Sequence, residues 1–162
     1  MQTSGYDADG RRHWDQAKAW AGSLNIDGVT GWRLPGGPMM NTPGTKSYNE
    51  TASEMGNLFY NVLGGTAGSN ITTTHNANYN LFKNVQHPFF YWSSVTFNGF
   101  NNWGFNFGNG GQNPTGNSTS HFGWAVRSGD VAASPVPVPG ALVLMGPALL
   151  GLLGVKRSRR RA

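Results

Sequence analysis

The stretch Phe89-Phe90-Tyr91-Trp92-Ser93-Ser94-Val95 decides the fold class, because a run of aromatic and β-branched residues is typical of a β-strand. A second run, Trp103-Gly104-Phe105-Asn106-Phe107, alternates large apolar residues with small or polar ones and predicts a strand with one buried face. Asn109-Gly110 is a hairpin signal, and residues 123–127 have the composition of a last strand. The second half of the body is therefore expected to form a small antiparallel sheet.

Two helices are expected before this sheet. Residues 14–24 carry apolar side chains at spacings of three and four, which indicates one face of a helix. The members of this face are Trp14, Ala17, Trp20, Ala21 and Leu24. Residues 52–63 show a similar stripe, preceded by the capping-box spacing of Thr51-Ala52-Ser53-Glu54 and followed by Gly64-Gly65 as a left-handed stop. Helices followed by a sheet predict an α+β domain over residues 1–131.

The polar segments between these elements are expected to be loops. Residues 64–80 and 108–121 are rich in Asn, Gly, Ser and Thr and show no apolar periodicity. The box Gly31-Trp32-Arg33-Leu34-Pro35 lies between the two helices, and we expect Trp32 to fill the core beneath the sheet. Arg33 is expected to pair with Glu54 or Asp130, and Arg127 to form a similar pair, because a desolvated guanidinium needs a partner.

The C-terminal residues combine three physical properties in a fixed order. Residues 132–139 are a Pro-rich linker, residues 140–155 are 16 uncharged residues rich in Gly and Leu, and a basic stretch closes the chain. As a helix, 16 residues measure roughly 24 Å, against roughly 30 Å for the hydrocarbon core of a bilayer, so a marginal membrane-spanning helix is predicted. A helix buried in the domain would be expected to show a polar face, and this run has none.

The residues that define this tail fall into two groups. The apolar residues of the predicted membrane segment are Ala141, Leu142, Val143, Leu144, Leu149, Leu150, Leu152 and Leu153. The basic residues are Lys156, Arg157, Arg159, Arg160 and Arg161. Since Lys and Arg remain on the cytoplasmic side of a membrane segment, we expect the C-terminus in the cytoplasm and the body outside.

The distribution of charge argues against nucleic-acid binding. The chain has 12 Lys and Arg and seven Asp and Glu residues, a formal net charge of +5. Five of the basic residues lie at positions 156–161, and the seven others are balanced by the seven acidic residues. The body therefore lacks the excess of positive charge with which proteins neutralise phosphates.

The tail resembles the PEP-CTERM sorting signal of exported bacterial proteins in the order of its parts, its length and its Arg-rich end. Val136-Pro137-Val138-Pro139 stands at the place of the sorting motif, with Val138 where the family's Pro-Glu-Pro has Glu. The resemblance implies processing by an exosortase-type enzyme. It also implies an inner-membrane intermediate with a cytoplasmic C-terminus, followed by release to the cell surface or the extracellular space. A plain C-terminal membrane anchor would have a similar sequence and remains the alternative.

The N-terminal residues lack an export signal. Residues 1–10 contain neither a charged n-region nor an apolar h-region. Because a substrate of the sorting pathway needs such a signal, we expect the signal peptide and a first strand to lie upstream of Met1.

The body resembles a bacterial domain of unknown function that often precedes PEP-CTERM tails. The resemblance runs from about residue 5 to 131. It lies in five landmarks: Trp14-Asp15-Gln16-Ala17, Gly31-Trp32-Arg33-Leu34-Pro35, Ser53-Glu54-Met55-Gly56-Asn57-Leu58-Phe59, Tyr91-Trp92-Ser93-Ser94 and Trp124-Ala125-Val126-Arg127-Ser128-Gly129-Asp130. It implies the C-type-lectin-like fold that the formylglycine-generating enzymes share. It implies no activity, because one fold supports many functions.

Candidate catalytic groups do not assemble into a known motif. The chain has no cysteine, which excludes formylglycine-type oxidation and a Cys-based zinc site, and no disulfide framework is available. Four histidines at positions 13, 75, 87 and 121 are scattered without ligand spacing. Asp7-Ala8-Asp9-Gly10 lacks the further ligands of a calcium loop and is interpreted as a turn. The sequence thus predicts no catalytic residue, no metal and no cofactor.

Two functions of different class remain open. In the first, the protein is a non-catalytic cell-surface or matrix protein whose Asn- and Gly-rich loops contact extracellular polysaccharide. Tyr91, Trp92 and Trp103 are candidates for stacking on sugars, and packing in the core is their alternative role. In the second, the body is a hydrolase or transferase delivered to the envelope by the same tail.

Overall fold

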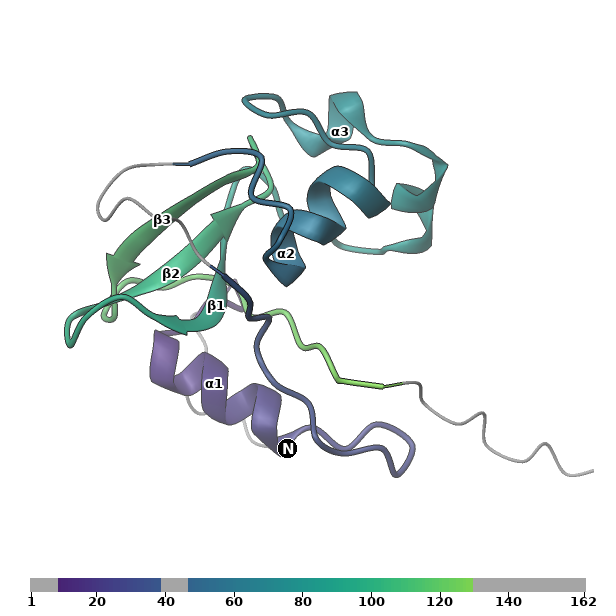
Figure 1. The fold of residues 1–162 in the computed structure, drawn as a ribbon. Helices are drawn as coiled ribbons and strands as arrows, with labels where there is room; N and C mark the ends of the chain where they lie inside the picture. The colour runs from purple at the N-terminus through teal and green to yellow at the C-terminus, as the bar shows by residue number, and fades with distance from the viewer. Residues whose placement is uncertain (1–8, 39–46, 130–162) are drawn as a thin grey trace, which may run out of the picture. The chain divides into compact units, whose positions relative to one another are not determined.

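The computed structural model describes residues 9–38 and 47–129 (Figure 1). The helices come first: α1 (Trp14–Ser23), α2 (Glu54–Gly56), the π-helix η1 (Asn57–Val62), α3 (Ile71–Thr74) and the 3₁₀-helix η2 (Ala77–Leu81). The strands β1 (Phe90–Thr96), β2 (Asn101–Asn106) and β3 (Gly111–Gly116) follow. This order confirms the α+β prediction at the level of fold class.

The three strands form an antiparallel sheet in the order β1-β2-β3. Tyr91 lies opposite Phe105 and Trp92 opposite Gly104, with an irregularity in the register between Trp92 and Thr96. The predicted hairpin at Asn109-Gly110 is confirmed, since Gly110 N donates to Asn106 O at 2.8 Å and Gly110 has a φ of +73°. Glycine adopts this left-handed conformation without a steric cost.

The third strand lies in a segment that the sequence analysis assigned to a loop. The sequence of β3, Gly-Gln-Asn-Pro-Thr-Gly, has no apolar alternation, and its extended conformation comes from pairing with β2 along its full length. Pro114 is tolerated because β3 is an edge strand. The last strand expected over residues 123–127 is wrong, because only one isolated bridge, between Arg33 and Val126, forms there.

Helices cover both faces of the sheet, which corrects the prediction of a half-buried strand. On one face, Tyr91 and Phe105 pack with residues of α2, η1 and α3 in the cluster Met55, Phe59, Leu63, Ile71, Tyr91, Phe105 and Phe107. On the other face, Trp92 packs with α1 in the cluster Trp14, Ala17, Ala21, Leu34 and Trp92. In Figure 1, α1 lies below the strands and α2 to their right. Residues 102–105 of β2 are consequently all buried.

The first helix follows its predicted pattern closely. It spans Trp14–Ser23, one residue shorter than expected, and buries Trp14, Ala17 and Ala21. Its N-terminus is fixed by the backbone amide of His13, which donates to Gln16 Oε1 at 3.1 Å. The helix ends at Leu24, which has extended backbone angles.

The second helix begins later than the predicted capping box. Ser53 is the N-cap, and its Oγ accepts a hydrogen bond from Gly56 N at 3.0 Å. The predicted cap at Thr51 is therefore wrong. In a capping box the carboxylate of Glu54 would accept a hydrogen bond from the backbone at the helix start, but here it is bound by Arg33. Beyond Gly56 the helix widens, with Leu63 N donating to Leu58 O at 2.9 Å, and it stops at Gly64 as predicted, with a φ of +75°.

Two short helices, α3 and η2, form in residues 64–80, which were expected to be loop, and η2 extends one residue beyond them. Asn70 caps α3 through a hydrogen bond from Thr72 N to its Oδ1, and Asn76 caps η2 in the same way for Asn78 N. Asparagine is a favoured N-cap, but helices of four and five residues are too short to show an apolar period.

In the box at residues 31–35, the side chain that is buried in the core is not the one that was expected. Trp32 is only part-buried, and its Nε1 donates to Val29 O at 2.9 Å. Leu34, with 1% of its surface exposed, fills the core instead. The assignment of Trp32 to the core is therefore wrong.

No helix within residues 9–38 and 47–129 is long and apolar enough to cross a bilayer. The apolar and basic residues of the predicted sorting segment, over 135–162, lie outside the described residues.

Candidate functional site

The three aromatic residues proposed for sugar stacking all lie in the interior. Trp92 has no exposed surface, and Tyr91 and Trp103 each expose 4%. Trp92 Nε1 donates to Arg12 O at 2.8 Å, and Tyr91 Oη accepts from Gln86 N at 2.6 Å. Burial raises the pKa of Tyr91 to about 12. These contacts favour the alternative interpretation of the three rings, as packing residues of the core.

The Arg33–Glu54 ion pair joins the box at residues 31–35 to the start of the second helix. The two terminal guanidinium nitrogens of Arg33, Nη1 and Nη2, donate to the two carboxylate oxygens of Glu54 at 2.6 and 2.8 Å. Gly36 N donates to Glu54 Oε2 at 2.6 Å. The hydrogen bonds from Arg33 hold the pKa of Glu54 below its usual value, and the same bonds raise the pKa of Arg33. The pairing predicted for Arg33 with Glu54 is therefore confirmed, and its alternative partner Asp130 lies outside the described residues.

Arg127 binds the backbone. Its Nε donates to Thr30 O at 2.8 Å, which joins the last described segment to the turn before the box. Together with the Arg33–Val126 bridge, this contact gives the two arginines of the sequence analysis structural roles.

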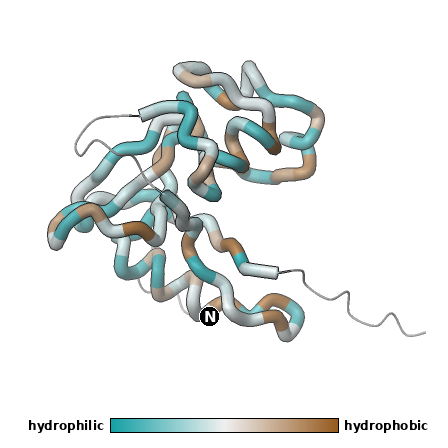
Figure 2. The backbone as a smooth tube through the Cα atoms, in the orientation of Figure 1, coloured by the Kyte–Doolittle hydropathy of each residue, from teal (hydrophilic) through white to brown (hydrophobic). Residues whose placement is uncertain are grey.

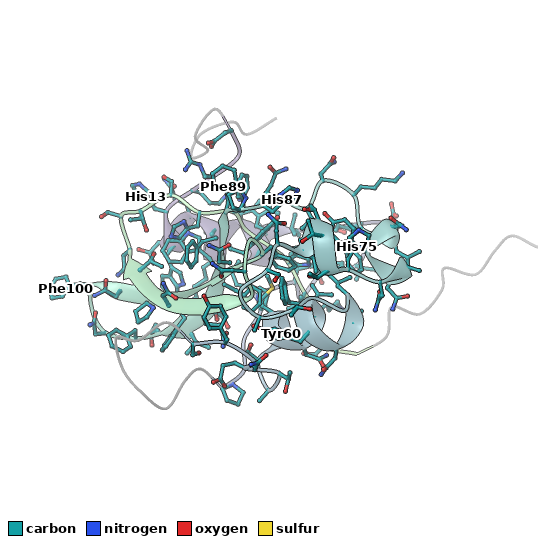
Figure 3. The ribbon with its side chains drawn as sticks, turned by 90° about the horizontal axis from the view of Figure 1, so that it is seen from above. His13, Tyr60, His75, His87, Phe89 and Phe100 are labelled. Atoms are coloured by element: carbon teal, nitrogen blue, oxygen red, sulfur yellow. The ribbon has the colours of Figure 1, made fainter. Side chains whose placement is uncertain are left out.

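The histidines stand apart from one another. His75 stacks on Tyr79 with ring centroids 4.4 Å apart, and His13 is the N-cap residue of α1. His121 lies against Trp92, with ring centroids 4.5 Å apart, and its Nε2 is 2.8 Å from Thr115 Oγ1. Figure 3 shows His13, His75 and His87 at separate places on the molecule. Within the described parts of the chain, no three His, Asp or Glu side chains lie together as a metal site would require.

Asp9, the described member of the acidic turn near the N-terminus, pairs locally. Arg11 Nε donates to Asp9 Oδ2 at 2.6 Å, and Arg11 N donates to Asp9 Oδ1 at 3.2 Å. Gly10 between them has a φ of +85°. Asp9 and Gly10 thus form the turn expected there, and residues 7 and 8 of the same string lie outside the described residues.

An exposed aromatic residue lies at the turn that joins β1 to β2. Phe100 exposes 84% of its surface, more than any other large apolar residue among those described. Figure 3 shows its side chain projecting from one end of the molecule, and Figure 2 shows apolar colour at this turn. Phe100 was not among the predicted site residues. The signal that points to it is the string Phe97-Asn98-Gly99-Phe100-Asn101, a polar turn with an aromatic residue between two predicted strands.

The backbone of this turn is fixed by asparagine side chains. Asn98 Oδ1 accepts hydrogen bonds from Phe100 N at 2.9 Å and Asn101 N at 2.8 Å. On the other side, Asn117 N donates to Phe100 O at 2.9 Å and Asn117 Nδ2 to Gly99 O at 3.2 Å. Asn102 Nδ2 donates to Asn117 Oδ1 at 2.6 Å, which ties Asn117 to the sheet. The ring of Phe100 is thus presented from a rigid base.

Comparison with known proteins finds no matching family model, no similar curated protein and no similar solved structure.

Proposed function

We propose that this chain is an exported, non-catalytic protein of the bacterial cell surface or extracellular matrix, sorted through its C-terminal segment. The observation that carries the proposal is the order of properties over residues 135–162, in which a Pro-rich linker precedes an apolar run and a basic end. The remainder of the chain has equal numbers of acidic and basic residues. Charge that is confined to one side of an apolar segment orients that segment in a membrane, with the basic end in the cytoplasm.

We further propose that the body has a C-type-lectin-like fold. The contacts among the five landmark segments support this proposal. Trp14 Nε1 donates to Ser93 O at 2.8 Å, and Ser93 Oγ and Ser94 N donate to Pro35 O at 3.0 and 2.8 Å. Arg33 extends the same set of contacts to the second helix and to the segment around residue 126, through its ion pair and its backbone bridge. These hydrogen bonds, the ion pair and the bridge therefore join landmark segments that are far apart in the sequence. Such contacts are expected if the landmark residues determine the fold.

The role proposed for the body is to hold extracellular polysaccharide through its polar loops. Its support is the exposure of amide and hydroxyl side chains such as Asn78, Asn98 and Ser118, which can form hydrogen bonds with the hydroxyl groups of sugars. Enzymatic activity of the body is the competing function. A hydrolysis screen on the same polysaccharides separates the two, since the proposal expects retention of the polysaccharide without release of products.

The sorting role is tested by fusing residues 135–162 to an exported reporter in cells with and without an exosortase. We expect a shorter C-terminus, measured by intact mass, only where the exosortase is present. A matched control replaces the five basic residues at 156–161 with Gln, which should disturb the orientation of the segment. An identical, full-length mass in both strains would contradict sorting and leave only a membrane anchor.

A further inference from the structure

Phe100 has a degree of exposure that the packing of the domain does not explain. The aromatic residues beside it in the sequence turn inward: Phe97 lies edge-on to Trp103 with ring centroids 5.8 Å apart, and Trp103 is buried. Phe100 instead keeps 84% of its surface in water. Exposing an aromatic ring forgoes the free energy of burying it, so the placement is informative where a fixed backbone enforces it.

The backbone around Phe100 is fixed from both sides. Its amide is held by Asn98 and its carbonyl oxygen by the amide of Asn117, and the buried Asn102 anchors Asn117 to β2. A ligand that contacts the ring would therefore meet a preorganised surface and would not have to order the loop first.

The sequence on both sides of Phe100 contains no charged residue. From residue 88 to residue 120, a span that contains the whole sheet and its turns, there is no Asp, Glu, Lys, Arg or His. The polar groups of the turn and of the segment that supports it are amides and hydroxyls, on Asn98, Asn101, Asn117, Ser118 and Thr119. Recognition of an anionic polymer or an anionic lipid surface relies on Lys and Arg, which this span lacks.

We propose that the β1–β2 turn is the polysaccharide contact of this protein and that its ligand is a neutral polysaccharide whose pyranose rings stack on Phe100. The inference rests on the proposed role of the body and names the site and the chemical class of its ligand. The ring supplies an apolar face for the C–H groups of a sugar, and the neighbouring amides and hydroxyls supply donors and acceptors for its hydroxyl groups.

The test measures retardation of the full chain, in a mild detergent, during native electrophoresis through gels that contain one polysaccharide. The neutral probes are dextran, mannan and laminarin, and the anionic probe is alginate. We expect retardation by at least one neutral probe, and Phe100→Ala should weaken this binding about tenfold, the effect of losing roughly 1.4 kcal/mol of stacking. Phe100→Tyr keeps an aromatic face and should retain binding, whereas Phe100→Leu should lose it.

Leu81→Ala is the matched control, because Leu81 also exposes 78% of its surface but lies in η2, outside the β1–β2 turn. It should bind as the unmodified chain does. Each Phe100 variant should keep the melting temperature of the unmodified chain, since the ring is exposed and its loss leaves no cavity.

The outcomes separate the site from the function. Binding of a neutral polysaccharide that Phe100→Ala leaves unchanged overturns the site but not the role of the body. Retention by none of the neutral probes, or by alginate alone, overturns the ligand class and removes the support for the binding role. Binding of a neutral polysaccharide that Phe100→Leu retains shows an apolar contact and overturns sugar stacking.

Discussion

At the scale of single residues, His121 is the titratable group most strongly affected by the fold. Its ring packs against Phe90 and Trp92, with centroids 5.3 and 4.5 Å away, and Nε2 lies within hydrogen-bond distance of Thr115 Oγ1. Burial, assisted by the positive charge of Arg11, lowers the pKa of His121 to about 4 from 6.5. The folded state therefore favours the neutral ring.

This shift makes a prediction for stability in acid. Because the unfolded chain takes up a proton at about pH 6.5 and the folded chain only near pH 4, His121 supports the fold fully above pH 6.5. That support is lost as the pH falls from 6.5 to about 4. We expect about 2 kcal/mol of lost stability, allowing for screening of a ring that is not fully buried. Urea unfolding at several pH values measures it.

The comparison variant is His121→Phe, which keeps a ring between Phe90 and Trp92 but cannot titrate. Its unfolding free energy should depend less on pH between 4 and 6.5 than that of the unmodified chain. Equal slopes over this window would show that His121 does not carry the acid sensitivity. As the pH falls below about 4.5 the Arg33–Glu54 pair also weakens, since the pKa of Glu54 is lowered in the fold and its contribution is lost as the carboxylate becomes protonated.

At the scale of elements, helix α1 and strands β1 and β2 could be predicted because their apolar residues repeat with the period of the element. Strand β3 and the short helices α3 and η2 could not, since their conformation depends on pairing with β2 and on asparagine caps. The aromatic residues of β1 and β2 were recognised as important. Their placement inside was left open because a sequence pattern does not show that helices cover both faces of the sheet.

Two glycines in helices make a paired prediction at this scale. A Cβ on Gly56 would overlap the carbonyl oxygen of Glu50 and lie 2.8 Å from Ser53 Oγ, at the cap of α2. A Cβ on Gly22, in α1, would meet nothing within 4 Å. We expect Gly56→Ala to destabilise the domain by about 3 kcal/mol through overpacking against fixed backbone. Gly22→Ala should stabilise it by about 0.5 to 1 kcal/mol through reduced backbone entropy.

Thermal or urea unfolding of the two variants under the same conditions checks this pair. Stabilisation by Gly56→Ala would mean that the turn before α2 is not packed as the structure shows. Destabilisation by Gly22→Ala would mean that the exposed face of α1 makes a contact outside residues 9–38 and 47–129.

At the scale of the whole molecule, charge is divided between the parts of the chain in an uneven way. The sheet and its turns carry no Asp, Glu, Lys, Arg or His, the remainder of the body is balanced, and the net charge of +5 arises at residues 156–161. This division was visible in the sequence alone because it depends only on composition along the chain. The site at Phe100 could not be predicted from the sequence, because the exposure of its ring depends on the hydrogen bonds that fix the β1–β2 turn.

The most direct test of the account is to locate the whole protein in bacteria that contain an exosortase and to measure the mass of its C-terminus. We expect the body to be digested by protease added to intact cells or to be recovered from the medium, with the basic residues at 156–161 removed. A full-length, unprocessed chain that is protected from protease and recovered from the soluble cytosolic fraction would contradict it.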